Sequence, residues 1–267
     1  RLNTPEDSGL RNTIEITNEV AVVLTRMYQS GFKIDVDALK NVRKEFVTEK
    51  NELENKLNTF TRELMGDTPI NLSSPEQLSW VLFSRKLINK KAWAECVNPY
   101  TPLPIFKSLI KSHFQTLYKT KATKCSACKG RGSYYKKKKD GSPFKNKTKC
   151  SVCKGTGFIY ESLNKVAGLK FTPPGSKWAS ANGFGTSKGN LEILERFALS
   201  KGMDKAKIFL EQLTRLSAIN SYLSNFVEGI ENYIKPDGLL HVRLNQHVTA
   251  TGRFSGASPN MQNMPRG

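Results

Sequence analysis

Apolar residues recur at helical spacing in two long stretches of the chain. Between residues 36 and 64 they follow one another at steps of three, four and seven: Leu39, Val42, Phe46, Leu53, Leu57, Phe60 and Leu64. Residues 204–235 repeat the spacing with Phe209, Leu213, Leu216, Leu223, Phe226, Ile230 and Ile234. A narrow apolar stripe on an otherwise charged helix needs a partner. We therefore expect two long helices that pair antiparallel although they are distant in sequence.

Local signals indicate where neighbouring helices begin and end. A further helical pattern covers residues 11–30, and Gly31 follows it as a C-terminal cap. Asp35 then precedes the first long helix as its N-cap. Farther along, Ser74 is the expected cap of a helix that has Pro75 at its first position, with Gln77 completing a capping box.

The rest of the chain alternates short elements with turns. Residues 105–118 are compatible with a helix, and residues 239–244 read as a strand. Residues 172–190 are rich in Gly, Pro and Ser, which predicts an ordered loop or linker; Gly183-Phe184-Gly185 within it reads as a turn. The fold class expected is mainly α, with a small β-hairpin insertion and a short strand segment, and therefore α+β overall.

The balance of charge narrows the possible partners. The 267 residues carry a formal net charge of +19, which predicts a polyanionic partner, nucleic acid first, with a merely solubilising surface as the alternative. No run of about 18 apolar residues occurs and no signal peptide is visible, so we expect a cytoplasmic protein without a membrane partner. Because the chain starts at Arg1 rather than Met, we expect it to be a piece of a longer protein.

Four of the five cysteines stand in two copies of one motif. Cys125-Ser-Ala-Cys128-Lys-Gly-Arg-Gly132 returns as Cys150-Ser-Val-Cys153-Lys-Gly-Thr-Gly157, and each copy reads CxxCxGxG. Two such knuckles supply four thiolates, the closed shell of one structural zinc ion, and a β-hairpin can join them. Iron–sulfur or redox use is the alternative, and four thiolates leave no open position for catalytic zinc. The fifth cysteine, Cys96, reads as a small buried side chain.

The repeated motif resembles the zinc domain of J-domain co-chaperones. That family carries four copies and two zinc sites, whereas two copies here imply one site, and the J-domain signature His-Pro-Asp is absent. The resemblance covers about 33 residues and implies a zinc knuckle rather than a chaperone.

Positive charge is concentrated around this motif. Residues 119–154 contain thirteen Lys or Arg and one acidic residue, a net charge of +12, with Tyr134, Tyr135 and Phe144 interleaved. Lysines with aromatics on a zinc scaffold suit a finger that tracks phosphates. The residues we expect to contact DNA here are Lys136, Lys137, Lys138 and Lys139. A solvated lysine loop without a partner is the alternative.

The last stretch is polar and specific. Residues 248–265 read VTATGRFSGASPNMQNMP, and they resemble the TATGRLSSxxPNLQNIP signature of family A, or DNA polymerase I-type, DNA polymerases. Three further landmarks of that family occur in order: GFKID at 31–35, NLSSPEQL at 71–78, and Thr186-Ser187 before a helix with Leu191 and Leu194. Together they cover most of residues 10–85 and 183–267.

The resemblance implies roles for individual residues. Arg253 matches the arginine at the minor groove of the primer terminus. The amides Asn260, Gln262 and Asn263 match those against the nascent duplex, and Thr251 and Ser255 shape the loop or touch phosphates. Arg266 follows Met264-Pro265 directly, without the usual hydrophobic residue between, and is only a candidate counterpart. The aspartates that bind catalytic Mg²⁺ belong downstream of Gly267, so no catalytic residue is expected in this chain.

The expected plan has four parts, and the expected function follows from it. Residues 1–85 form the first thumb segment, 86–182 an inserted basic zinc module, 183–235 the second thumb segment, and 236–267 the start of the palm. The chain would hold double-stranded primer–template DNA in a polymerase, of phage origin given the insertion. The zinc module would add grip on DNA or bind a processivity factor. The alternatives are a subunit of a split polymerase that pairs with a palm–fingers chain, and a zinc-ribbon DNA-binding accessory protein.

Overall fold

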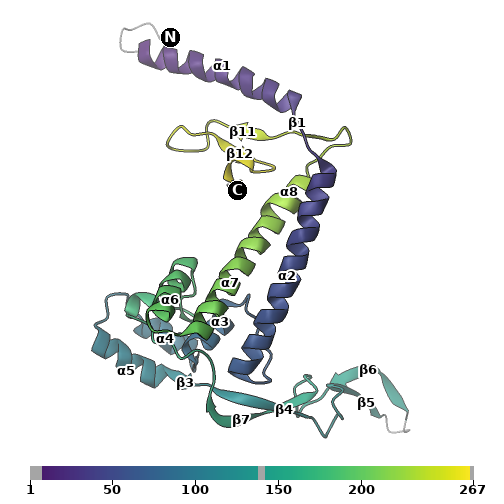
Figure 1. Ribbon diagram of the computed structural model, residues 1–267, viewed down its shortest axis with the longest axis vertical. Coiled ribbons are helices and arrows are strands. Elements are labelled where there is room, and N and C mark those ends of the chain that lie inside the picture. The colour runs from purple at the N-terminus through teal and green to yellow at the C-terminus, as the bar shows by residue number, and fades with distance from the viewer. Residues whose placement is uncertain (1–7, 138–141, 265–267) are drawn as a thin grey trace. The chain divides into compact units, whose positions relative to one another are not determined.

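The computed structural model describes residues 8–137 and 142–264 (Figure 1). They form two compact units: the first joins the chain up to Leu53 with the chain from Arg215 onward, and the second is Glu54–Thr214. Helices are combined with two-stranded antiparallel pairs, so the prediction of an α+β fold is confirmed. Among the described residues, no helix is both long enough and apolar enough to cross a membrane.

The first unit is built from three helical segments and short strands. Its elements are α1 (Ser8–Ser30), β1 (Phe32–Lys33), the first part of α2 (Val36–Met65), the last part of α7 (Asp204–Tyr222), the π-helical turn η3 (Leu223–Val227), α8 (Glu228–Glu231), β10 (Leu239–Leu240), β11 (Arg243–Asn245), β12 (Ser255–Ala257) and the 3-10 turn η4 (Met261–Asn263). Strand β1 pairs with β10, and β11 pairs with β12, both antiparallel.

Helix ends in this unit follow the expected signals. Gly31 has φ of +65°, and its N–H donates to the Met27 carbonyl, so it caps α1. The Asp35 carboxylate accepts from the N–H groups of Asp37 and Ala38 at 3.1 and 2.9 Å, so it caps α2. Both predictions are confirmed.

The apolar stripe of α2 is buried within this unit against the segment formed by α7, η3 and α8. Leu53, Ile219, Leu223 and Val227 form a buried cluster with Phe46 packed against it. Phe46 also meets Tyr222, with ring centroids 5.8 Å apart. Residue numbers rise along one segment as they fall along the other, so the two run antiparallel here. The segment α7–η3–α8 differs from the expected helix over 204–235, because it passes through the π turn η3 and ends at Glu231.

The second unit surrounds an aromatic core. Its remaining elements are α3 (Pro75–Phe83), β2 (Arg85–Leu87), α4 (Lys90–Cys96), α5 (Leu103–His113), β3 (Phe114–Thr116), β4 (Tyr118–Lys124), β5 (Ser133–Lys137), β6 (Pro143–Lys149), β7 (Phe158–Val166), the 3-10 turn η2 (Ser176–Trp178), β8 (Ala179–Ser180), β9 (Gly183–Phe184) and α6 (Lys188–Ser200). Phe114 stacks on Phe184 at 4.5 Å, and the buried Trp93 donates its Nε1–H to the Ser180 carbonyl. Phe60 of α2 packs on Phe209 of α7 in this unit.

This core joins segments that lie on both sides of the predicted module boundaries. Phe83 precedes residue 86 and Phe184 follows residue 182, yet both pack in the core beside Trp178 and Trp93. The boundaries at 85/86 and 182/183 remain predictions. We call residues 118–166, which include the strands β4 to β7 and the two cysteine knuckles, the finger.

Several local predictions are corrected. Ser74 is the N-cap of α3 but makes no side-chain capping hydrogen bond. Gln77 does not complete the capping box, because its Oε1 accepts from the N–H of Asn71 at 2.7 Å and the Ser74 N–H donates to the Asn71 carbonyl. The helix expected over 105–118 ends at His113, because Phe114 is drawn into an extended pairing with Leu87. Cys96, expected to be buried, is exposed at the end of α4.

The remaining corrections concern turns and strands. The loop expected over 172–190 contains η2 and the hairpin β8–β9, so Gly183 and Phe184 lie in a short strand. The strand expected over 239–244 is divided into β10 and β11, because its two ends pair with different strands, β1 and β12. The helix expected after Thr186-Ser187 is confirmed as α6; Ser187 is its N-cap, and Leu191 and Leu194 are buried.

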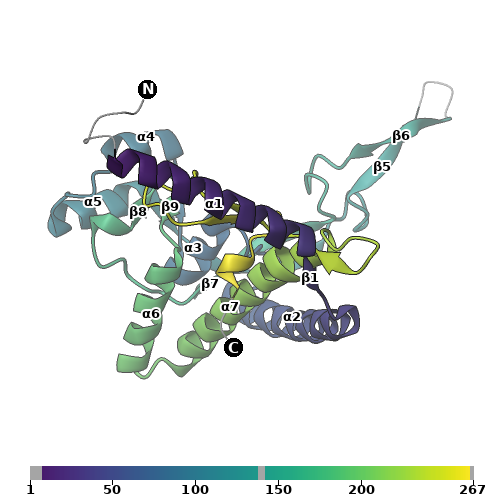
Figure 2. The same cartoon turned by 90° about the horizontal axis from the view of Figure 1, so that it is seen from above.

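The finger consists of two ribbons in series. The root ribbon pairs β4 with β7, and the tip ribbon pairs β5 with β6. Figures 1 and 2 both draw the tip ribbon on the side of this unit opposite α4 and α5, with the root ribbon between them. The two cysteine knuckles lie where the ribbons meet.

Candidate metal centre and C-terminal loop

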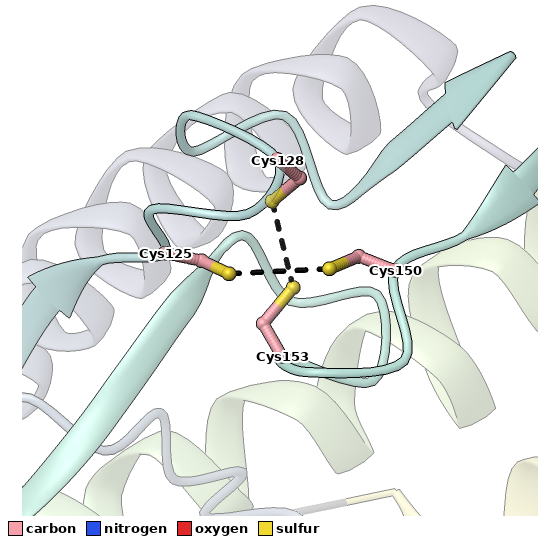
Figure 3. A group of neighbouring side chains, drawn as sticks. All are labelled: Cys125, Cys128, Cys150 and Cys153. Carbon is pink, nitrogen blue, oxygen red and sulfur yellow. Dashed lines mark hydrogen bonds between the residues drawn. The ribbon is translucent and has the colours of Figure 1, made fainter.

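The four knuckle cysteines converge on one point. Figure 3 shows their sulfur atoms directed at one another from two turns. The Sγ atoms of Cys125 and Cys150 lie 3.9 Å apart, those of Cys128 and Cys153 lie 3.7 Å apart, and all four fall within 4.8 Å of one another. A tetrahedral zinc ion with bonds of 2.3 Å requires sulfurs about 3.8 Å apart, whereas a disulfide requires about 2.05 Å. The donor set therefore fits a metal ion held by four thiolates.

The two knuckles are related by a local two-fold arrangement. The Cys125 N–H donates to the Gly157 carbonyl at 2.9 Å, and the Cys150 N–H donates to the Gly132 carbonyl at 2.8 Å. The Gly132 N–H points at the Cys128 sulfur at 3.3 Å, and the Gly157 N–H points at the Cys153 sulfur at 3.2 Å. The repeated sequence thus becomes a repeated backbone, in which amides support the sulfurs.

Glycine is required where the knuckles touch. Gly132 and Gly157 have φ of +71° and +80°. A Cβ on Gly132 would lie 2.4 Å from the Gly155 carbonyl oxygen, and a Cβ on Gly157 would lie 2.4 Å from that of Gly130. The last glycine of each CxxCxGxG copy is therefore fixed both by backbone conformation and by close contact with the other knuckle.

The backbone around Cys153 favours its thiolate. Burial of this thiol opposes ionisation, but the N–H groups of Gly157 and Gly155 and the neighbouring thiols together lower its pKa to about 6. Cys125, Cys128, Cys150 and Cys153 are all buried. Thiolate is the form in which cysteine binds metal, so the surroundings of Cys153 suit ligation.

The finger is attached to the end of α2 through its root ribbon. Gly66 and Thr120 form a β-bridge, and the Thr120 carbonyl accepts from the Asp67 N–H at 2.9 Å. The Thr68 N–H donates to Thr120 Oγ1 at 3.0 Å, and the two hydroxyls lie 2.6 Å apart. A Cβ on Gly66 would lie 2.2 Å from the Thr120 carbonyl oxygen. Sequence reasoning missed this attachment.

Asp67 reinforces the same junction with its carboxylate. Its Oδ2 accepts from the Ala122 N–H of the root ribbon at 2.9 Å, and its Oδ1 pairs with Arg62 Nε at 3.2 Å. The Ala122 N–H and then the Arg62 guanidinium lower the pKa of Asp67 below its usual value. The root ribbon therefore has a charge-assisted hydrogen bond to the chain that follows α2.

The tip ribbon carries exposed basic and aromatic side chains. Lys136, one of the predicted DNA contacts, is exposed on β5. Lys138 and Lys139 lie outside the described residues, and Lys137 is described only as backbone of β5. Tyr135 is 50% exposed and lies opposite Lys147 of β6, whose ammonium is 5.5 Å from the ring centroid. The alternation of residues 145, 147 and 149 along the sequence could have indicated this lysine.

The predicted primer-terminus residues occur in and after one hairpin. Thr251 and Arg253 are exposed in the connection between β11 and β12, and Ser255 is half-buried at the start of β12. Thr249 donates its hydroxyl to the Arg253 carbonyl, which fixes the backbone and leaves the guanidinium exposed.

The amides that follow serve partly to order this segment. Gln262 Oε1 accepts from the Gly256 N–H at 2.8 Å, and Asn260 Oδ1 accepts from the Gln262 N–H at 3.2 Å. Both side chains are exposed, and the N–H₂ group of each remains a donor at the surface. Asn263 is described only as backbone of η4, and Arg266 lies outside the described residues. The segment is thus an ordered loop.

Comparison with known proteins relates this chain to bacterial DNA polymerase I. It is 24% identical to DNA polymerase I of Bacillus subtilis over 252 residues, 94% of this chain and 17% of that protein. It is 33% identical to the thermostable DNA polymerase I of Thermus aquaticus over 69 residues, 26% of this chain and 8% of that protein. No family model matches the chain.

Among solved structures, one similar chain is the POL domain of Pol1 from M. smegmatis in complex with DNA primer-template and dNTP. The two chains are 20% identical with a TM-score of 0.46, and the similarity covers 91% of this chain and 25% of that one. The chain resembles DNA polymerase I in sequence and spans less than a fifth of the Bacillus subtilis protein's length.

Proposed function

We propose that this chain is the primer–template-holding part, thumb and start of the palm, of a family A DNA polymerase. The observation that carries the proposal is the similarity to DNA polymerase I along 94% of the chain, with the signature of residues 248–265 at one end of it. The antiparallel pairing of α2 with α7 is compatible with a thumb. Polymerase activity is proposed for the whole protein, of which this chain would be one part.

The proposed task of the C-terminal loop is to test the shape of the primer terminus. Acceptors in the minor groove occupy similar places in every Watson–Crick pair. Arg253 and the surface N–H₂ groups of Asn260 and Gln262 are donors that could contact those acceptors without reading sequence. An ordered loop lowers the entropy lost when such donors bind. Contact would be lost at a mispair, which displaces the acceptors.

The proposed metal is one structural zinc ion at Cys125, Cys128, Cys150 and Cys153. Zinc would have no catalytic role there, because four thiolates fill its coordination shell. The chain's own contribution is to hold the knuckles against each other and so to fix where the two ribbons leave the cluster. The finger would then add grip on DNA through its lysines, with the docking of a processivity factor as the alternative.

The first experiment tests Arg253 in the polymerase that contains this chain. Arg253→Ala should slow primer extension and reduce discrimination between a paired and a mispaired primer terminus by about tenfold or more, because a hydrogen bond from a charged donor is lost. Arg243→Ala is the matched control, since Arg243 is also exposed and lies on β11 of the same hairpin. Equal losses in the two variants would contradict the proposal for Arg253.

The second experiment separates a polymerase part from an accessory DNA-binding protein, a possibility that the basic finger raises. Substituting Lys136–Lys139 by Glu should shorten the product made per binding event and flatten the salt dependence of duplex binding. An accessory protein would bind duplex through these lysines while Arg253→Ala had no effect. Unchanged processivity and an unchanged salt slope would remove the lysines from the DNA site.

A further inference from the structure

The two ribbons of the finger are copies of one plan, offset by 25 residues. Each ribbon pairs a strand next to one knuckle with a strand next to the other. The residue pairs Cys125 with Cys150 and Gly132 with Gly157 are equivalent. By the same offset Tyr135 of the tip ribbon is equivalent to Tyr160 of the root ribbon. Both tyrosines occupy a cross-strand pair, and only their partners differ: Tyr160 faces Ala122, whereas Tyr135 faces Lys147.

The difference between the partners changes what the tyrosine can do. Tyr160 is partly buried on the root ribbon. Tyr135 is half exposed, and the Lys147 ammonium approaches its ring. Lys149 lies two residues farther along β6, so the pleat places it on the same face as Lys147. The aliphatic part of Lys149 covers the turn at Gly155, where its Cδ lies 3.6 Å from the position that a Cβ on Gly155 would take. Lys149 is exposed and adds a second positive charge.

We propose that the Tyr135 face of the tip ribbon binds single-stranded nucleic acid. A base would stack on the Tyr135 ring, and the neighbouring phosphates would pair with Lys147 and Lys149. The proposal deepens the DNA-holding function proposed above and rests on it. An exposed ring beside cations is the arrangement that single-strand-binding surfaces use, because every base has a flat face that stacks.

A single strand fits this face better than a duplex does. In a duplex the bases stack on one another and present only their edges in the grooves, so an aromatic ring gains nothing that a lysine would not provide. Cross-strand stabilisation of the ribbon is a competing reason for a Tyr–Lys pair. That role would change stability and leave the affinity for nucleic acid unaltered, so binding measurements separate the two.

The test measures binding of the zinc-loaded full chain to a fluorescent oligo-dT strand by anisotropy. Tyr135→Leu should weaken binding about tenfold, the loss expected for one stacked base, while Tyr135→Phe should retain binding because the ring remains. Tyr134→Leu is the matched control: Tyr134 is the preceding residue, is also exposed, and faces Thr148 on the opposite side of the ribbon. This control should change binding by less than twofold.

Lys147→Ala, which restores the residue found at the equivalent position of the root ribbon, should lower the salt slope of oligo-dT binding by about 0.7. Zinc content must be unchanged in all variants, which shows that the finger is intact.

Equal effects of Tyr135→Leu and Tyr134→Leu would overturn the inference. So would an equal loss of oligo-dT and blunt duplex binding in Tyr135→Leu, because that would indicate general grip without stacking. Neither result bears on the proposed function, which is tested separately by the response of primer extension to Arg253→Ala. Selective loss of oligo-dT binding in Tyr135→Leu, with primer–template binding kept, is the expected result.

Discussion

The root and tip ribbons leave the same cysteine cluster, yet their surroundings differ. In the root ribbon Thr120 accepts hydrogen bonds from the N–H groups of Asp67 and Thr68, and the Ala122 N–H donates to the Asp67 carboxylate. The tip ribbon carries Tyr135, Lys147 and Lys149 on a polar surface. The charge of the sequence follows the same division: the strands of the root ribbon have a net charge of +3, and residues 133–149 have +6.

The repeated motif therefore supports two ribbons that have different roles. The knuckle sequence fixes the backbone at the cluster in both copies, through the same pairs of N–H, sulfur and carbonyl groups. The strands beyond the knuckles are then free to diverge in side chains. The root ribbon attaches the finger to the chain that follows α2, and the tip ribbon presents cations. The predictions that follow test this division, beginning with the largest effect.

Loss of the metal should affect both ribbons at once. Cys128→Ser, or removal of zinc with a chelator, should unfold the finger, because binding of a structural metal supplies most of the folding free energy of such a small module. Heteronuclear NMR spectra should lose the dispersed amide signals of residues 118–166 while those of the Phe114 and Phe184 core remain. The control is Cys96→Ser, since Cys96 is exposed and outside the cluster. A finger that stays folded in Cys128→Ser would contradict the role of the metal.

Substitution at the junction should separate the root ribbon from α2. Gly66→Ala places a Cβ 2.2 Å from the Thr120 carbonyl in a backbone with φ of +83°, and should lower the free energy of unfolding by about 3 kcal/mol. Gly202→Ala is the control. Gly202 has φ of +63° with open space around it, so it has the conformational cost alone, about 1 kcal/mol. Chemical denaturation measures both, and equal losses would show that the close contact contributes nothing.

Acid should weaken the same junction, because it protonates the Asp67 carboxylate. The pKa of Asp67 is lowered in the folded chain by the Ala122 N–H and Arg62, so its contribution is fully present above the ordinary carboxyl pKa and is lost as pH falls through the lower, folded value. Asp67→Asn should flatten the part of the stability curve that lies below the ordinary carboxyl pKa of about 3.9. Thermal unfolding at a series of pH values measures it, and an unchanged curve would remove Asp67 from the junction.

The smallest effect is expected on the tip ribbon. Lys147→Ala removes a cross-strand contact with an exposed tyrosine, so it should cost less than about 1 kcal/mol of stability. Ala122→Lys provides the reverse exchange in the root ribbon, where Ala122 is half-buried and donates its N–H to Asp67. Denaturation curves of both variants compare the ribbons directly. A loss in Lys147→Ala as large as that in Gly66→Ala would contradict a purely surface role.

Spacing along the sequence was sufficient for the features that depend on neighbours in the chain. The CxxCxGxG copies predict four converging thiols, the apolar stripe predicts α2, and Gly31, Asp35 and Ser187 indicate helix ends. Each of these signals acts within one turn or one repeat. The structure agrees with all of them.

Other features depend on residues that meet only in three dimensions. The junction of Gly66 with Thr120 joins residues 54 positions apart with no periodic signal. Gln77 was predicted to complete a capping box at Ser74, but its side chain accepts from the N–H of Asn71 instead. The pairing of Tyr135 with Lys147 requires the register of β5 and β6, which the composition of the segment does not determine. The predicted DNA contacts of Arg253 and the lysines remain predictions.

The most direct test of the central claim is zinc K-edge absorption spectroscopy on the purified chain, combined with metal analysis. Because Cys125, Cys128, Cys150 and Cys153 bring their sulfurs to the spacing that a tetrahedral ion requires, we predict one zinc ion per chain with four sulfur ligands at about 2.3 Å. A chain that retains no zinc, or a zinc ion with nitrogen or oxygen among its ligands, would contradict it.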